Sequence, residues 1–341
     1  FTAYVQVPEI LMASAIAYTL PKRTPPPIIT TARRWLTTAA PSASIPRQRC
    51  PGQTRHFASE QQPSGCAPMQ VSASFELLNL APQSDAASAD SLDKLTAMLR
   101  ASREEGGVLV VSGAGISTAS GIADYRSPGR PLYKPMTHQD FVGSDKARRR
   151  YWARSMNGYL RLAKAKPNRG HFALAELQKA GYVGSIITQN VDRLHQSAGS
   201  DNVLELHGTI HAAECLKCGG REDREMLQHR LEATNPQWIH HAKEQLQHRP
   251  DGDVDLPPGL HYEDYEVPPC THCGSEGTLK PAVVFHGGSL EPAVRDHATY
   301  LAENSPSLLV VGSTLTVFSS FRLAREMHKR GRDVAILNVG E

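Results

Sequence analysis

Four of the six cysteines in this 341-residue chain form two pairs whose spacing suits a metal ion. The pairs are Cys215-x-x-Cys218 and Cys270-x-x-Cys273. Two thiolates at this spacing can reach one ion, and two such pairs supply a closed tetrahedral set of sulfur ligands for zinc. Redox chemistry of a single pair is the alternative, but it requires a thioredoxin-like setting that the surrounding sequence does not provide. We therefore predict one structural Zn²⁺ per chain.

A second chemical feature is the stretch 108–127, which reads VLVVSGAGISTASGIADYRS. Its apolar start, Val108–Val111, runs into the turn Gly113–Gly115, which is how a buried parallel strand ends and a helix begins. Glycines let a ligand approach the backbone, and the first N–H groups of the helix would point at a diphosphate. The third glycine of a G-x-G-x-x-G turn is absent, because Thr118 stands there. Taken alone, the turn is equally consistent with a plain strand-to-helix connection.

Polar residues that could act on a sugar follow the next two predicted strands. The segment Thr188–His195 reads TQNVDRLH, and its Asn190 and Asp192 offer an amide and a carboxylate. An Asx-type turn would explain the isolated segment equally well. His207 follows the second strand within Glu205-Leu206-His207-Gly208, and a neutral imidazole is a natural base near neutral pH. We interpret His195 as structural.

Small residues end two later predicted strands in the same manner. Gly312–Thr314 places a hydroxyl-bearing turn after one strand, and Asn338–Gly340 repeats that placement after the last one. Such turns suit a phosphate or a ribose, although either could be no more than the end of a core strand. Ligands of open α/β sheets bind at the carboxyl ends of the strands, so these turns belong to the candidate site.

The elements that must position these residues alternate between strand and helix. Helical patterns begin near Asp90, Asp145, Asn168, 291 and 318. The predicted strands are Val108–Val111, Ser185–Thr188, Val203–Leu206, Ala282–Phe285, Leu308–Val311 and Val334–Leu337. This order predicts an α/β fold, a Rossmann-like doubly wound parallel sheet with a small inserted four-cysteine zinc-binding module at 213–275.

Together these motifs resemble the sirtuins, NAD-dependent protein deacylases, over about residues 90–341. The segments RRYWAR (149–154), NPQW (235–238) and VGSTLTV (311–317) are similar to the mitochondrial class II branch of that family. The resemblance implies that NAD is bound at one set of positions: Gly113, Ala114, Gly115, Ser117, Asp124, Tyr125, Arg126, Gln189, Asn190, Asp192, Gly312, Ser313, Thr314, Asn338 and Gly340. It also implies that His207, with Asn190 and Asp192, performs the catalysis.

The implied reaction transfers the acyl group of an acyl-lysine to ADP-ribose and releases nicotinamide. The amide oxygen of the acyl-lysine attacks the ribose carbon that bears nicotinamide, and His207 then helps a ribose hydroxyl to attack in turn. Two features depart from the family pattern. The run Phe285–Gly288 reads FHGG, which changes a wall near the acyl-lysine channel, and the chain stops at Glu341, so we expect a truncated catalytic domain over 91–341.

Three other functions have to be weighed against deacylation. An NAD dehydrogenase should present an acid about 20 residues beyond the glycine turn, but Lys134 and Pro135 stand there. A non-catalytic NAD- and zinc-binding module would bind but release no nicotinamide. Mono-ADP-ribosyl transfer to protein is the remaining alternative, because the same activated ribose can be attacked by another nucleophile.

The first part of the chain has the composition of a mitochondrial transit peptide. No Asp or Glu occurs from Met12 to Ser59, whereas seven Lys and Arg do, among many Ser, Thr, Ala and Pro residues. We predict a transit peptide over 1–57, cleaved after Phe57, a linker over 58–90 and a location in the mitochondrial matrix. The expected partners are acyl-lysine-bearing mitochondrial proteins. Neither nucleic acid nor a membrane is expected, because the net charge is only +3 and the apolar run 10–20 is too short to span a bilayer.

Overall fold

The structure of the chain is a computed structural model that describes residues 2–6, 89–125, 135–243, 254, 256 and 259–338. Arg126 and Gly340 of the predicted cofactor site lie outside the described residues. So do nearly all of the predicted transit peptide 1–57 and the linker 58–90, apart from the backbone of 2–6 and the first residues of a helix.

Six parallel strands form the main sheet, as the sequence predicts for its Rossmann-like part. The order across the sheet is β1-β9-β8-β2-β3-β4. The bounds are β1 Thr2–Gln6, β2 Val108–Ser112, β3 Val183–Thr188, β4 Val203–Glu205, β8 Ser307–Val311 and β9 Asp333–Asn338. Apolar β-prone residues fill β2 and β8, which are buried throughout because helices cover both faces.

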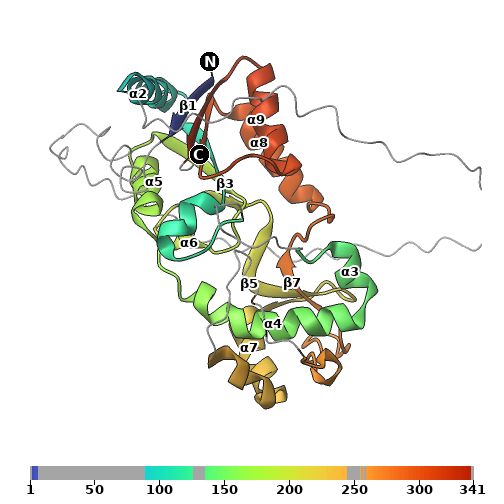
Figure 1. The fold of residues 1–341 in the computed structure, drawn as a ribbon. Helices are drawn as coiled ribbons and strands as arrows, with labels where there is room; N and C mark the ends of the chain where they lie inside the picture. Colours follow the sequence, from blue (N-terminus) through green and yellow to red (C-terminus); the bar gives the residue numbers. More distant parts are fainter. Residues whose placement is uncertain are drawn as a thin grey trace, which may run out of the picture. The chain divides into compact units, whose positions relative to one another are not determined.

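Helices lie on both faces of the main sheet (Figure 1), and alternate side chains of β2 belong to two different core clusters. On one face Val108 and Val110 of β2 pack with helices α2 Ala89–Arg103 and α5 Arg169–Lys179. On the other face Leu109 and Val111 pack with α8 Pro292–Asn304 and α9 Phe318–Lys329. This three-layer arrangement is that of a doubly wound α/β fold.

A second, three-stranded antiparallel sheet carries the cysteines. Its order is β6-β5-β7, with bounds β5 Gly208–Cys215, β6 Arg221–Asp223 and β7 Leu279–Val283. The strand predicted at Ala282–Phe285 is therefore wrong in both position and sheet, since β7 pairs antiparallel with β5 and not with the parallel sheet. The small sheet also extends beyond 213–275 at both ends.

The small sheet packs on a long helix, α4 Asp145–Ala163. The indole Nε1 of the buried Trp152 in α4 donates to the carbonyl of Leu279 in β7 at 2.8 Å. Arg224, at the start of α7 Arg224–Thr234, is buried with its guanidinium 4.1 Å from the centre of the Tyr159 ring.

The remaining elements are short. They are η2 Ala114–Ser120, α3 His138–Gly143, α6 Leu194–Ser197, η3 Pro236–Lys243 and η4 Tyr262–Asp264.

Strand β1 was not predicted. It lies within the predicted transit peptide and pairs in parallel register with β9, for example Tyr4 with Ile336. Its sequence TAYVQ contains three β-prone residues, which suit an edge position.

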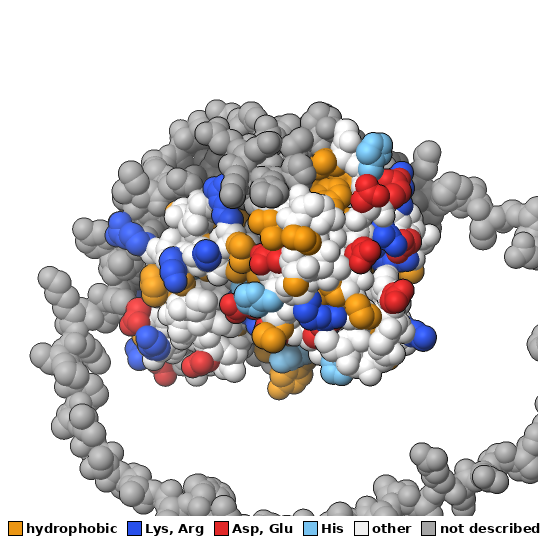
Figure 2. Space-filling model, turned by 90° about the horizontal axis from the view of Figure 1, so that it is seen from below, with side chains coloured by type: hydrophobic (Ala, Val, Ile, Leu, Met, Phe, Trp, Pro, Cys, Tyr) orange, Lys and Arg blue, Asp and Glu red, His pale blue; other side chains and the backbone are white. Residues whose placement is uncertain are grey.

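The face seen from the side of α7 is chemically mixed. Figure 2 shows basic, acidic and hydrophobic side chains lying among one another on this face. Met226 of α7 is among the exposed large hydrophobic side chains of the described residues. Within the described part of the chain, no helix combines the length and apolarity that a bilayer span requires.

Candidate active site

The predicted site residues meet at the carboxyl edge of the main sheet. From the central strand β2 the chain moves outward through β3 and β4, and it later returns on the other side through β8 and β9. The reversal lies between β2 and β8, and such a topological switch point is where open α/β sheets bind their ligands. The turns Gly113–Gly115 and Gly312–Thr314 begin there, one on each side of the switch point.

The glycines of the two turns touch each other. A Cβ on Gly115 would lie 2.9 Å from the carbonyl oxygen of Gly312, and a Cβ on Gly113 would lie equally close to it. The N–H of Gly115 donates to that same oxygen at 2.9 Å, and the N–H of Gly113 donates to Val311 at 3.0 Å. The N–H groups of Gly113 and Gly115, which were candidates to bind a diphosphate, therefore already donate to protein carbonyls. Both residues must be glycine because the backbone of Gly312 lies too close for a side chain.

The helix η2 that follows the first turn is tied to the TQNVD segment through one hydroxyl. The Oγ of the buried Ser117 donates to Asp192 Oδ2 at 2.7 Å, and it accepts from Asn190 Nδ2 at 3.0 Å. The N–H of Leu194 donates to Asp192 Oδ1 at 3.0 Å. Burial raises the pKa of Asp192, whereas these donors lower it. The sequence did predict that Ser117, Asn190 and Asp192 belong to one site.

Gln189 connects the same edge to the second turn and to α9. Its Nε2 donates to Ser313 Oγ at 2.8 Å, and its Oε1 accepts from the hydroxyl of Ser320 at 2.9 Å. The amide therefore fixes the end of β3 relative to the turn after β8. Ser320 lies in the first turn of α9.

His207 lies at the same edge, beyond β4, with both ring nitrogens engaged. Its Nδ1 is 3.2 Å from the carbonyl oxygen of Gln189, and its Nε2 is 2.8 Å from Ser319 Oγ. Burial lowers the pKa of His207, the hydrogen bond to Gln189 raises it, and the nearby His286 lowers it further. A ring held neutral in this way can accept a proton near neutral pH.

Glycine is required directly after His207. Gly208 has a φ of +78°, and a Cβ there would lie 2.1 Å from the carbonyl oxygen of Ala282. The N–H of Val284 donates to the carbonyl of His207 at 2.9 Å. The end of β7 in the small sheet therefore holds the backbone of His207 and Gly208, and no side chain fits between them.

His195 is structural, as its sequence position suggested. It is 1% exposed, and its Nε2 lies 2.8 Å from the hydroxyl of Ser112 at the end of β2. The centre of its ring is 5.0 Å from that of the buried His171. Burial lowers the pKa of His195 to about 4 and that of His171 to about 3, so both rings are neutral within the core.

The other described residues of the predicted set follow β2, β8 and β9 in the chain. Ala114 and Gly115 are half-buried in η2, and Thr314 is exposed in the turn after β8. Asn338 ends β9, two strands from β2 and toward the β1 side. Asp124, which is half-buried, and Tyr125, which is 51% exposed, come after η2 in the chain. The structure thus brings the predicted residues of the strand-end turns to one edge of the sheet.

The four paired cysteines come together in the small sheet. Their Sγ atoms all lie within 4.8 Å of one another, and Cys215–Cys273 and Cys218–Cys270 are each 3.8 Å apart. A tetrahedral zinc with Zn–S bonds of about 2.3 Å has S···S edges of about 3.8 Å, so the geometry fits. None of the four is in a disulfide.

Comparison with known proteins identifies the family. Residues 113–319 match the model of the Sir2 family. The NAD-dependent protein deacylase SIR4 of Monosiga brevicollis is 46% identical to the chain over 237 residues, which are 68% of this chain and 75% of that protein. The chain belongs to the Sir2 family.

Other relatives have similar names, and a solved Sir2 structure has a similar fold. The NAD-dependent protein deacylase Sirt4 of Drosophila melanogaster is 45% identical over 69% of this chain and 75% of its own length. SRT2 of Arabidopsis thaliana is also named an NAD-dependent protein deacylase. It is 41% identical over 77% of this chain and 73% of its own length. A solved Sir2–p53 peptide–NAD⁺ complex matches 73% of this chain and 87% of that chain, with a TM-score of 0.55 and 28% identity.

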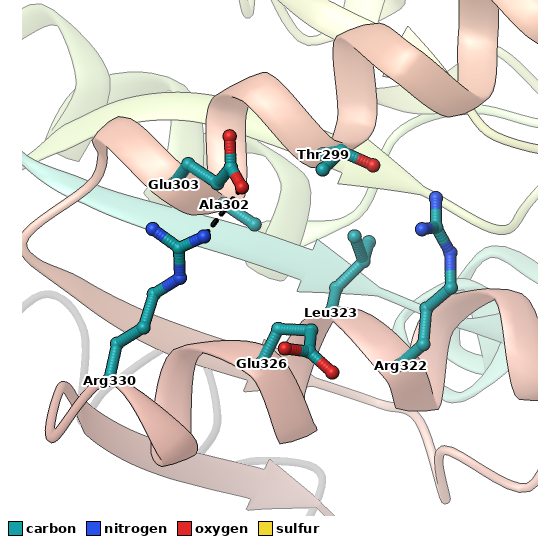
Figure 3. Close-up of a pocket in the computed structure, with 7 residues that line it drawn as sticks. All are labelled: Thr299, Ala302, Glu303, Arg322, Leu323, Glu326 and Arg330. Carbon is teal, nitrogen blue, oxygen red and sulfur yellow. Dashed lines mark hydrogen bonds and ion pairs between the residues drawn. The ribbon is translucent and has the colours of Figure 1, made fainter.

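A separate pocket of about 210 Å³ lies away from this Sir2 site, between α8 and α9 (Figure 3). Its charged side chains already interact with protein groups. Arg330 Nη2 bonds Glu303 Oε1 at 2.5 Å, and Arg322 donates to the carbonyl of Arg295 at 3.2 Å. None of the predicted site residues lines it.

Sequence reasoning missed the serines of α9. Ser319 and Ser320 lie more than 110 residues from their partners His207 and Gln189, and each reaches one of them. The only available signal was the hydroxyl-rich stretch just after the predicted turn Gly312–Thr314.

Proposed function

We propose that this chain is an NAD-dependent protein lysine deacylase, which transfers the acyl group of an acyl-lysine to ADP-ribose and releases nicotinamide. Sir2 membership and the deacylase names of the relatives support this activity. The observation that carries it is the position of His207, a neutral imidazole at the same sheet edge as the polar side chains of Gln189, Asn190 and Asp192.

NAD fits the donor set of this edge. Amide, hydroxyl and carboxylate groups converge at the end of an otherwise apolar sheet, which suits the ribose hydroxyls and the carboxamide of a nucleotide. We assign Asn190 and Asp192 to hold the nicotinamide half, and Ser313 and Thr314 to hold the phosphate and adenosine side. Bound NAD supplies the ribose carbon at which the bond to nicotinamide breaks.

The chain contributes orientation and a proton acceptor. Asp192 and Asn190 are held by Ser117, so their geometry is fixed before any ligand binds, which lowers the entropic cost of reaching a reactive arrangement. His207 accepts a proton from a ribose hydroxyl at Nε2. The four cysteines hold one Zn²⁺ away from the reacting groups, in a closed site with no open coordination position.

The test is nicotinamide release. The full chain incubated with NAD and an acyl-lysine peptide should release nicotinamide, detected by chromatography, in proportion to the peptide present. The matched control is the same peptide with an unmodified lysine. Binding of NAD without any peptide-dependent release would identify a non-catalytic module instead.

We also propose that the mature protein works in the mitochondrial matrix on acyl-lysine proteins there. The acid-free, Arg-rich run from Met12 to Ser59 supports import, and Arg55 lies at the usual distance before a cut after Phe57. Import should therefore leave Ala58 or a neighbouring residue as the N-terminus. N-terminal sequencing of protein from intact cells measures this, and a mature chain that retains the residues around Met12 would contradict it.

A further inference from the structure

The imidazole of His207 makes a second contact that the proposed reaction does not account for. Its Nε2 is 2.8 Å from the hydroxyl of Ser319, the second residue of α9. The neighbouring Ser320 does not share this contact, because its single hydroxyl hydrogen is shared between two other acceptors, Gln189 Oε1 and the carbonyl of Val317, each 2.9 Å from its Oγ. Two adjacent serines of one helical turn therefore have different partners.

The contact at Nδ1 of His207 determines which group donates the hydrogen bond between Nε2 and Ser319. A backbone carbonyl can only accept, so the contact with Gln189 requires the hydrogen of the neutral ring to be on Nδ1. The Nε2 atom then carries the ring's lone pair, and Ser319 must donate its hydroxyl hydrogen to it. This lone pair is the one that His207 needs as a base. In the absence of substrate it is already in use.

We propose that Ser319 is a positioning residue that caps the base: its hydroxyl occupies the Nε2 lone pair of His207 until a substrate hydroxyl displaces it. The inference rests on the base role proposed for His207. A single lone pair cannot accept two well-aligned hydrogen bonds. The proton of the ribose hydroxyl can therefore move to Nε2 only after Ser319 has turned away. Its half-buried position at the start of a helix leaves the hydroxyl room to rotate.

The surroundings favour the neutral, capped ring in the free protein. The N-terminus of α9 presents the positive end of its dipole to the imidazole, which disfavours a charged ring. Among the described titratable groups, His286, which follows β7, is the one whose charge acts on His207. On the neutral ring the hydroxyl of Ser319 donates to the Nε2 lone pair, whereas on a protonated ring the same hydroxyl would accept from Nε2–H.

The variants Ser319→Ala, Ser319→Thr and Ser320→Ala test the cap. In the full chain labelled with ¹⁵N-histidine, the Nε2 signal of His207 is assigned by its loss in His207→Ala and measured by NMR at a pH where the ring is neutral. In Ser319→Ala this signal should move downfield of the wild type, because the Nε2 lone pair has lost its hydrogen-bond donor. Ser319→Thr keeps a hydroxyl and should restore the wild-type chemical shift. Ser320→Ala is the matched control and should leave it unchanged.

Removal of the cap should raise kcat/KM, whereas loss of a contact that assists catalysis would lower it. The quantity that reports on the free protein is kcat/KM of Ser319→Ala. On the high-pH plateau it should rise about two- to ten-fold, the equivalent of one neutral hydrogen bond that no longer has to be displaced. The pH dependence of kcat should not move, because the cap is already displaced in the substrate complex.

Two results would overturn the cap. One is an unchanged Nε2 chemical shift of the neutral His207 ring in Ser319→Ala. The other is a plateau kcat/KM that falls, which would place Ser319 in the proton path or in the packing. Failure of the proposed function would look different, because His207→Ala would then turn over normally whatever the NMR spectra of the Ser319 variants show.

Discussion

Replacement of His207 by alanine should slow acyl-lysine turnover by about 10²–10⁴-fold, the usual contribution of a positioned general base. NAD binding should be largely retained, because the ring contacts Gln189 only through a backbone carbonyl, and the side chains assigned to the nucleotide bond one another. Exchange of free nicotinamide into NAD should survive better than deacylation, since the first attack on the ribose carbon needs no base. Parallel assays of both reactions measure this split.

The control for this substitution is His297→Ala, which removes an exposed histidine from α8. It should leave both reactions at wild-type rates. If His207 were only a packing residue, its alanine variant would lose thermal stability and NAD affinity together. Deacylation by His207→Ala at close to the wild-type rate would refute the base assignment.

Replacement of Cys215 by alanine should abolish tight zinc binding and unfold the small sheet. Three remaining thiolates no longer close the tetrahedron, and the free energy of metal binding in structural zinc sites is largely folding free energy. The damage should reach the active site, because β7 follows Cys270 and Cys273 in the chain and its end holds the backbone of His207. Metal analysis should find one zinc per wild-type chain and almost none in the variant, with a lower melting temperature.

Cys66→Ala provides the comparison, since Cys66 belongs to neither C-x-x-C pair. It should keep both the zinc and the melting temperature. A well-folded wild-type protein that contains no zinc would contradict the assignment. A normal melting temperature in Cys215→Ala would show that the metal does not hold the small sheet together.

The sequence predicted best where local pattern and tertiary position agree. The apolar run of Val108–Val111 is a parallel strand buried on both faces, so its composition alone is informative. The same reasoning failed at Ala282–Phe285, because the apolar run around β7 pairs antiparallel with β5. An apolar run gives no information on its partner, and here the partner is set by the inserted module.

The glycine turn shows a second limit. Its spacing predicted a turn at the end of β2, which the structure has, but the sequence predicted the glycines for closeness to a ligand. In the structure Gly113 and Gly115 are needed because Gly312 approaches them from another strand. Likewise, no local signal joins Ser319 to His207, which lie 112 residues apart and meet only through the order of the strands. Contacts of this kind follow from topology and cannot be found by scanning for motifs.

Mass spectrometry of the reaction products tests the central claim most directly. The full chain is incubated with NAD and a panel of peptides that carry different acyl groups on one lysine. We predict that at least one peptide returns with a free lysine, together with nicotinamide and O-acyl-ADP-ribose of the matching acyl mass. A peptide or protein that gains ADP-ribose while every acyl-lysine stays intact would contradict deacylation and identify the chain as a mono-ADP-ribosyltransferase.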